Sequence, residues 1–149
     1  MKYSTKLSDA VHILVFIELN PKSDLSSAAI AESIQTNPSF VRQIMMALRK
    51  AELIISVRGH AAPALTRKPE AITLLDIYKA VEKDKPLLHL NTHTNPACGV
   101  GVNIQLALQD YYDAVQETAE DKMRQISIQD IIDSYYVRIK NMGPASDSI

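Results

Sequence analysis

The residues best suited to a specific chemistry lie on one face of the stretch 38–50, which carries hydrogen-bond donors and positive charge but no carboxylate. Apolar residues at helical spacing form the back of this stretch, and Asn37 and Pro38 suit the start of a helix. A helix that enters the major groove of DNA needs this layout, with donors near its N-terminus. The same pattern fits a surface helix with a basic face, so the neighbouring segments decide. The outward positions are Ser39, Arg42, Gln43, Met46, Arg49 and Lys50, with Phe40 at the border of the two faces.

The segments on either side predict a helix-turn-helix followed by a β-hairpin. Ser26 can cap a first helix over residues 26–35, and Thr36-Asn37-Pro38 forms the turn. After the second helix, residues 53–57 and 64–66 have the composition of two short strands. Arg58 lies at the tip of the hairpin, where it can contact phosphates. Together these parts indicate a winged helix-turn-helix.

A second group of reactive side chains lies in the stretch 87–101, which we interpret as a loop. His89, His93 and Cys98 offer three ligands for a metal, but their spacing matches no strong motif, so we expect no metal and no cofactor. Cys98 comes just before a long helix, whose N-terminus favours a thiolate and hence oxidation. The alternative is an inert cysteine.

Catalytic patterns are absent from the sequence. There is no glycine-rich phosphate loop, no HExxH and no GxSxG, and the carboxylates within 110–121 follow the spacing of a solvated helix face. We therefore expect that the protein is not an enzyme.

Composition predicts one globular domain, alone or with an extension. The 149 residues are 46% hydrophobic and 22% charged, and the longest apolar run, 11–19, is too short to span a membrane. With no signal peptide and one cysteine, we expect a cytoplasmic protein without an internal disulfide. The net charge is −1, but residues 1–70 hold nine Lys and Arg against six Asp and Glu, and the remainder holds seven against eleven. A basic half suits a DNA-facing domain.

The longest helix is predicted over residues 102–125, and its apolar stripe has little of its own chain to pack on. Pairing with a second copy buries it and gives a two-fold dimer that reads a palindromic DNA site. The alternative is that it folds back on the first helix of its own chain, predicted over residues 9–20 with Ser8 as cap. The stripe comprises Ile104, Leu108, Tyr111, Val115, Ala119, Met123 and Ile126.

Helices are also predicted over residues 74–83, capped by Thr73, and 128–139, capped by Ser127. The expected organisation is a winged helix-turn-helix DNA-binding domain over 1–84, a sensor-type loop over 85–101, the dimerisation and C-terminal helices over 102–140, and a tail over 141–149.

The order of these parts resembles the Rrf-two family of bacterial winged helix-turn-helix transcription regulators, which includes IscR, NsrR and CymR. The resemblance covers nearly the whole chain and is carried by the run 48–54, by Ser56-Val57-Arg58-Gly59 and by Ile72-Thr73-Leu74-Leu75-Asp76-Ile77. The single-cysteine, YwnA-like branch is the most similar.

The resemblance implies a homodimeric DNA-binding repressor. By position, Ser39, Phe40, Arg42 and Gln43 are expected to face bases, and Tyr3, Lys6, Arg49 and Arg58 to hold the DNA backbone. Two features depart from the family pattern. Only Cys98 stands where cluster-binding members use three cysteines, so no iron-sulfur cluster of that kind is expected. Ala61 and Ala62 occupy wing positions where glycines are common, so the wing turn must differ.

The sequence therefore predicts a mainly α fold with a small β-hairpin wing and a long dimerisation helix. The expected function is sequence-specific DNA binding by a homodimeric transcriptional regulator, with oxidation of Cys98 as a modulator. Two alternatives stay open. One is a winged-helix protein-interaction module that does not bind DNA, and the other is a regulator gated by a metal or small ligand.

Overall fold

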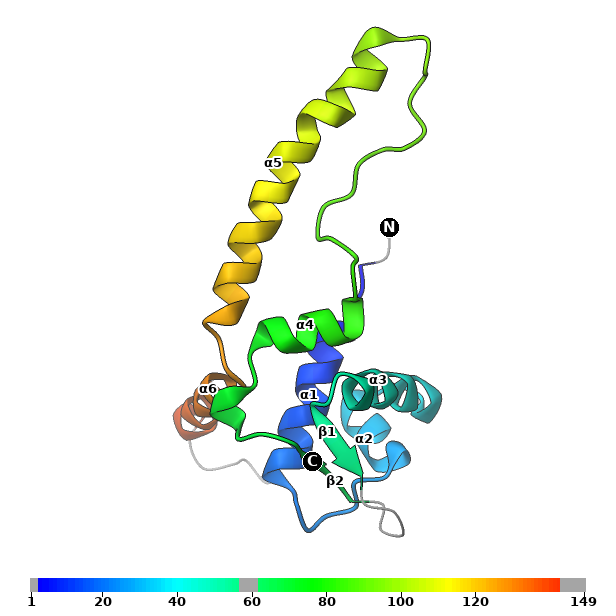
Figure 1. The fold of residues 1–149 in the computed structure, drawn as a ribbon. Coiled ribbons are helices and arrows are strands. Elements are labelled where there is room, and N and C mark those ends of the chain that lie inside the picture. The colour runs from blue at the N-terminus through cyan, green and yellow to red at the C-terminus, as the bar shows by residue number, and fades with distance from the viewer. Residues whose placement is uncertain (1–2, 57–61, 143–149) are drawn as a thin grey trace.

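The computed structural model describes residues 3–56 and 62–142 and is mainly helical, with one two-stranded antiparallel sheet (Figure 1). The sequence prediction of a helical fold with a small hairpin is confirmed. In chain order the elements are α1 (Lys6–Leu19), α2 (Ser27–Ile34), α3 (Pro38–Lys50), β1 (Ile54–Ser56), β2 (Pro63–Leu65), the 3-10 helix η1 (Pro69–Ala71), α4 (Leu74–Glu82), α5 (Gly99–Arg124) and α6 (Ile128–Asn141).

The turn between α2 and α3 is fixed by local hydrogen bonds. The Ser26 side chain accepts from the Ala29 N–H at 3.2 Å, which caps α2 as predicted. Gln35 ends α2 in the left-handed region, with a φ of 63°. Two residues later, the Asn37 carboxamide oxygen accepts the Phe40 N–H at 2.8 Å and caps α3, with Pro38 in its first turn.

The hydrophobic core surrounds α1, which packs against α2, α3, α4, α6 and strand β2. Ile13 and Leu14 of α1 are fully buried, and the back of α3 meets them through Val41 and Leu48. Burial of each such side chain contributes roughly 1.5–3 kcal/mol relative to exposure. The orientation of α3 therefore depends on its packing against α1.

The hairpin continues directly from α3. Ile54 pairs with Leu65 and Ser56 with Pro63, and the Thr66 hydroxyl donates to the Glu52 carbonyl oxygen at 2.6 Å. These contacts hold both strands against the end of α3. The expectations for Arg58 and for Ala61 fall outside the described residues, while Ala62 is described and exposed.

The predicted starts of two helices are wrong. The first helix begins at Lys6 rather than residue 9, because Ser8 is not its cap: the Ser8 hydroxyl donates to the Thr5 carbonyl oxygen at 3.0 Å from within the helix. The long helix begins at Gly99 rather than residue 102. Cys98 is thus the N-cap of α5, and its sulfur accepts from the Gly101 N–H at 3.4 Å.

The helices α1 to α4 and the hairpin together form what we call the winged body. Helix α5 extends from it as a long arm, with the segment between α4 and α5 running beside the arm (Figure 1). It has 26 residues, none of which is buried. None of the helices in the described ranges combines the length and apolar character that a membrane crossing requires.

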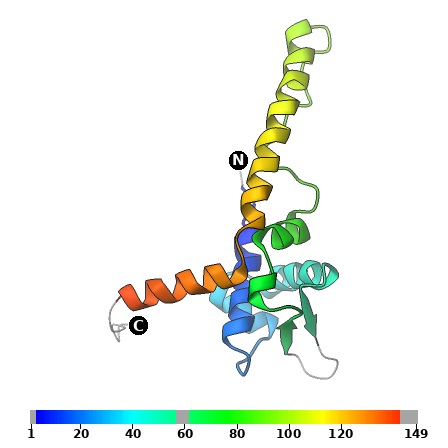
Figure 2. The ribbon, with the colours of Figure 1, turned by 60° about the vertical axis from the view of Figure 1, so that its left-hand side comes forward.

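Helix α6 returns to the winged body, a contact that the sequence patterns did not indicate. Ile128 and Ile132 join the core, and the Ile128 N–H donates to the Ile72 carbonyl oxygen at 2.9 Å. The capping boxes of α4 and α6 lie together, because Thr73 and Ser127 form an isolated β-bridge. The far half of α6 projects from the body (Figure 2).

We expect Ile128→Ala to lower the free energy of unfolding by about 2–5 kcal/mol, because it leaves a cavity where α6 meets the core. Urea unfolding followed by circular dichroism measures this change. Ile55→Ala removes the same atoms from an exposed strand position and should cost less than about 1 kcal/mol. Equal losses in the two variants would contradict the packing of α6 described here.

Candidate nucleic-acid interface

Helix α3 presents a polar face to solvent because its other face is held by the core. Val41, Ile44, Met45 and Leu48 are buried, and Ser39, Arg42, Gln43, Met46, Arg49 and Lys50 are exposed, as the spacing predicted. The Arg42 guanidinium donates to the Ser39 hydroxyl at 3.1 Å. Three donor-bearing side chains therefore stand together on the first two turns of α3, where a helix entering a major groove contacts base edges.

Phe40 differs from its polar neighbours on α3. Its ring is half-buried and packs against the core. Only part of the ring is left at the surface, so Phe40 anchors the start of α3 as well as bordering its polar face.

The C-terminal end of α3 borders a hollow of about 620 Å³ shared with the hairpin. Arg49 lines it from α3, Glu52 from the turn after α3, and Arg67 from the segment after β2. The hollow therefore carries two guanidinium side chains and one carboxylate.

Arg67 lies just after the hairpin, beside this hollow. Its guanidinium donates to the Ala71 carbonyl oxygen at 3.0 Å and lies 3.6 Å from the Asp76 carboxylate. The same carboxylate accepts the Thr73 N–H in the capping box of α4. That capping box was visible in the sequence, but the approach of Arg67 to it depends on the path of the chain after the hairpin.

The N-terminal site residues lie on a different element from α3. Tyr3 precedes α1 and is 82% exposed, and Lys6 is the first residue of α1. The Ser4 hydroxyl donates to the Glu82 carboxylate at 2.5 Å, which ties this segment to the end of α4. Arg58, the remaining selected residue, lies outside the described residues.

Comparison with known proteins agrees with this geometry. A family model described as "Rrf2: Iron-dependent Transcriptional regulator" matches residues 3–134. The chain belongs to the Rrf2 family. A curated relative, YwnA of Bacillus subtilis (strain 168), is a candidate HTH-type transcriptional regulator that is 35% identical over 133 residues, covering 89% of this chain and 98% of the relative.

Solved structures agree on the fold of this Rrf2 protein. A crystal structure of a candidate DNA-binding protein has a TM-score of 0.70 at 34% identity, covering 85% of this chain and 98% of the other. The structure of T. potens IscR has a TM-score of 0.65 at 22% identity, covering 91% of this chain and 88% of the other. The protein is thus a helix-turn-helix DNA-binding transcriptional regulator of the Rrf2 family, and its relatives are regulators rather than enzymes.

The family description names iron, and the residues that the structure describes do not form an iron site. Cys98 is the one cysteine in the sequence. Within residues 3–56 and 62–142, no three His, Cys, Asp or Glu side chains are grouped so that they could hold a metal ion, so His89, His93 and Cys98 do not form one. Asn95 instead organises the turn before α5, since its side chain accepts from the Ala97 N–H at 2.9 Å.

Proposed function

We propose that this Rrf2 protein acts in the cytoplasm as a homodimeric repressor that binds a palindromic operator. The observation that carries the proposal is the polar face of α3, which holds donors, basic groups and no carboxylate. A dimer bound across a promoter represses by excluding the polymerase. In this proposal residues 1–84 bind DNA, residues 85–101 carry the sensing function, and the rest of α5 together with α6 forms the dimer.

We assign the contacts with base edges to residues at the start of α3. Ser39, Arg42 and Gln43 carry the donors, with Phe40 beside them, and each well-placed contact contributes about 1–3 kcal/mol of discrimination. The DNA backbone is assigned to Tyr3 and Lys6 near the start of the chain, to Arg49 on α3 and to Arg58. The hollow between Arg49 and Arg67 supports a phosphate contact there.

We assign the dimer interface to α5 because several of its apolar side chains are exposed. Tyr111 is 73% exposed and Val115 49%, with Ile104 on the same stripe. The projecting half of α6 adds Tyr136 and other exposed apolar side chains. Apolar surface of this extent is uncommon on a monomer, and a second copy covers it by two-fold symmetry.

Modulation by oxidation is assigned to Cys98. Its thiol is exposed and stands at the N-cap of α5. An oxidised sulfur no longer accepts from the Gly101 N–H in the same way, which changes the start of α5. Because α5 forms the proposed dimer, a change at its start alters how the two DNA-binding domains are held relative to each other.

We expect Arg42→Ala to relax the sequence preference, because it removes a base contact worth about 1–3 kcal/mol. Lys6→Ala should weaken binding to all sequences alike and reduce the slope of log K against log salt by about 1. Selection from a pool of random duplexes gives the preferred site, and titrations at several salt concentrations give the slope. Equal losses of preference in both variants would refute these assignments, and a pool without enrichment would favour the interaction module.

We expect Val115→Glu to convert a dimer to a monomer, because it places a charge in the proposed apolar contact. Light scattering after gel filtration measures the mass. Glu117→Gln, an exposed change on the same helix, serves as the control and should leave the dimer intact. A wild-type chain that is monomeric at micromolar concentration would overturn this assignment.

We expect peroxide to weaken operator binding by the wild-type protein and to leave Cys98→Ser unaffected, because the thiol is then missing. Fluorescence anisotropy with the selected operator measures both. Reduction by dithiothreitol should restore binding to the wild type. Loss of binding by both proteins would show that the sensitive residue is another one, with the methionines as the next targets.

A further inference from the structure

A groove of about 860 Å³ lies between the recognition helix α3, helix α4 and the long helix α5. Its volume falls within the range of small-molecule sites, which favour the junctions between structural units. An occupant would contact the helix that bears the proposed base contacts and the helix that bears the proposed dimer contacts. The groove is lined from α3 by Met46, Ala47 and Lys50, from α4 by Tyr78 and Lys79, and from α5 by Gln116 and Glu120.

The charges lining the groove favour an anion. Four lysines line it against two acids, Asp84 and Glu120. One of these acids already has a partner, since the Glu120 carboxylate lies 3.7 Å from the Lys79 ammonium. The surplus of positive charge is therefore supplied by the lysines at 50, 83 and 85.

The groove also has an apolar part. Met46 and Ala47 line it from α3, Ala51 lines it from the C-cap of α3, and the buried Tyr78 lines it from α4. Met46 is 64% exposed, and a thioether is an adaptable apolar contact. A ligand that uses the whole groove therefore needs an acid group and an apolar body.

Lys83 has a backbone conformation that a glycine would adopt at lower cost. It ends α4 with a φ of 55° and a ψ of −124°. Such a conformation costs a non-glycine residue on the order of 1–3 kcal/mol. The residue at this strained position lines the groove.

We propose that this groove binds a small organic anion, an acid group on an apolar body, and that the anion regulates the DNA binding proposed above. The regulatory part rests on that proposed function, and the binding part does not. The acid group is held by Lys50, Lys79 and Lys83, and the apolar body lies on Met46 and Ala47.

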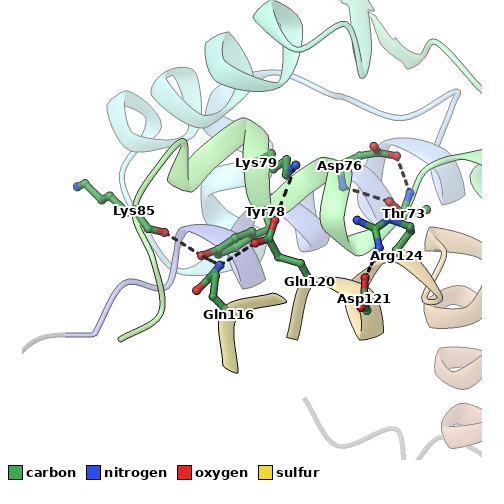
Figure 3. Close-up of polar contacts among 9 residues, drawn as sticks. All are labelled: Thr73, Asp76, Tyr78, Lys79, Lys85, Gln116, Glu120, Asp121 and Arg124. Carbon is green, nitrogen blue, oxygen red and sulfur yellow. Dashed lines mark hydrogen bonds and ion pairs between the residues drawn. The ribbon is translucent and has the colours of Figure 1, made fainter. Parts of the chain in front are cut away.

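A hydrogen-bonded junction beside the groove links the ligand site to α5 (Figure 3). The Gln116 amide donates to the Tyr78 hydroxyl oxygen at 3.1 Å and to the Glu120 carboxylate at 3.3 Å, and its carbonyl oxygen accepts the Leu87 N–H at 2.9 Å. The Tyr78 hydroxyl donates in turn to the Lys85 carbonyl oxygen at 2.8 Å. One side chain thus joins α4, α5 and the start of the loop.

An anion at Lys79 competes with Glu120 for the same ammonium group. Glu120 then loses its ion pair, and its hydrogen bond from Gln116 no longer has a fixed acceptor. The junction that sets α5 against α4 becomes looser, and the spacing of the two recognition helices in a dimer changes with it. Binding of the anion therefore weakens operator binding.

A DNA backbone fits this groove less well than a small anion. Its phosphates would stand beside Asp84 and Glu120 as well as the lysines, at a repulsive cost. It also presents no large apolar group for Met46 and Ala47. The small organic anion uses both parts of the surface.

The probe is 8-anilinonaphthalene-1-sulfonate, a fluorescent sulfonate on an aromatic body, titrated into the full chain. We expect saturable binding of one dye per chain, displaced by benzoate and not by the uncharged benzyl alcohol. The double variant Lys50→Gln/Lys83→Gln should raise the dye Kd about tenfold or more, because two charged contacts are lost. The matched control, Lys22→Gln/Lys122→Gln, changes two exposed lysines outside the groove and should bind as the wild type.

Two results would overturn the proposal. Unchanged dye binding by the groove variant would place the dye on the exposed apolar faces of α5 and α6 instead. Weaker operator binding by the groove variant, with no anion present, would make the two lysines phosphate contacts. If no operator is enriched from random duplexes while the dye still binds as expected, the DNA-binding proposal fails and the anion site stands.

Discussion

The packing of the back of α3 on α1 is the interaction on which the rest of the structure depends. Val41, Ile44 and Leu48 are buried together with Ile13 and Leu14, and this contact fixes which side of α3 is left to solvent. A rotation of α3 by one residue, about 100°, would bury charged groups, which costs several kcal/mol each. The polar face is therefore set by the core and not by the polar residues themselves. The hairpin follows α3 directly, so its place is set by the same contact.

Local signals predicted most elements correctly because they act over a few residues. The caps at Ser26, Asn37, Thr73 and Ser127 each use a side chain and an N–H three residues away, and each is formed. The start of α5 was predicted too late, since Gly99 and Gly101 were assigned to the preceding loop. The structure places both glycines in the first turn of the helix. A Cβ at Gly101 would lie 3.2 Å from the Asn95 carbonyl oxygen. The turn before α5 passes so close to the helix at this point that it leaves little room for a side chain.

Contacts between distant segments could not be predicted from the sequence. The periodicity of residues 38–50 gave the polar face of α3, because one helix carries the whole pattern. Gln116 and Tyr78 are 38 positions apart, and neither is unusual among its neighbours in the sequence. Ser4 and Glu82 are 78 positions apart, and their contact depends on how α1 crosses α4. The return of α6 to the core is of the same kind, since an apolar pair such as Ile128 and Ile132 fits several packing partners.

The distribution of charge gives the protein a direction of approach to DNA. Helix α3 carries three basic residues and no acid, whereas α5 carries five acids against two basic residues. A polyanion is therefore attracted to the winged body and repelled by the arm, although the net charge of the chain is only −1. Binding strength from such a modest positive surface is limited for one copy, because phosphate contacts supply most of the affinity. In the proposed dimer, two copies held together by α5 would double those contacts without making either copy strongly basic. The proposed dimer would thus compensate for the modest charge, with α3 as the proposed source of specificity and two-fold symmetry as the source of affinity.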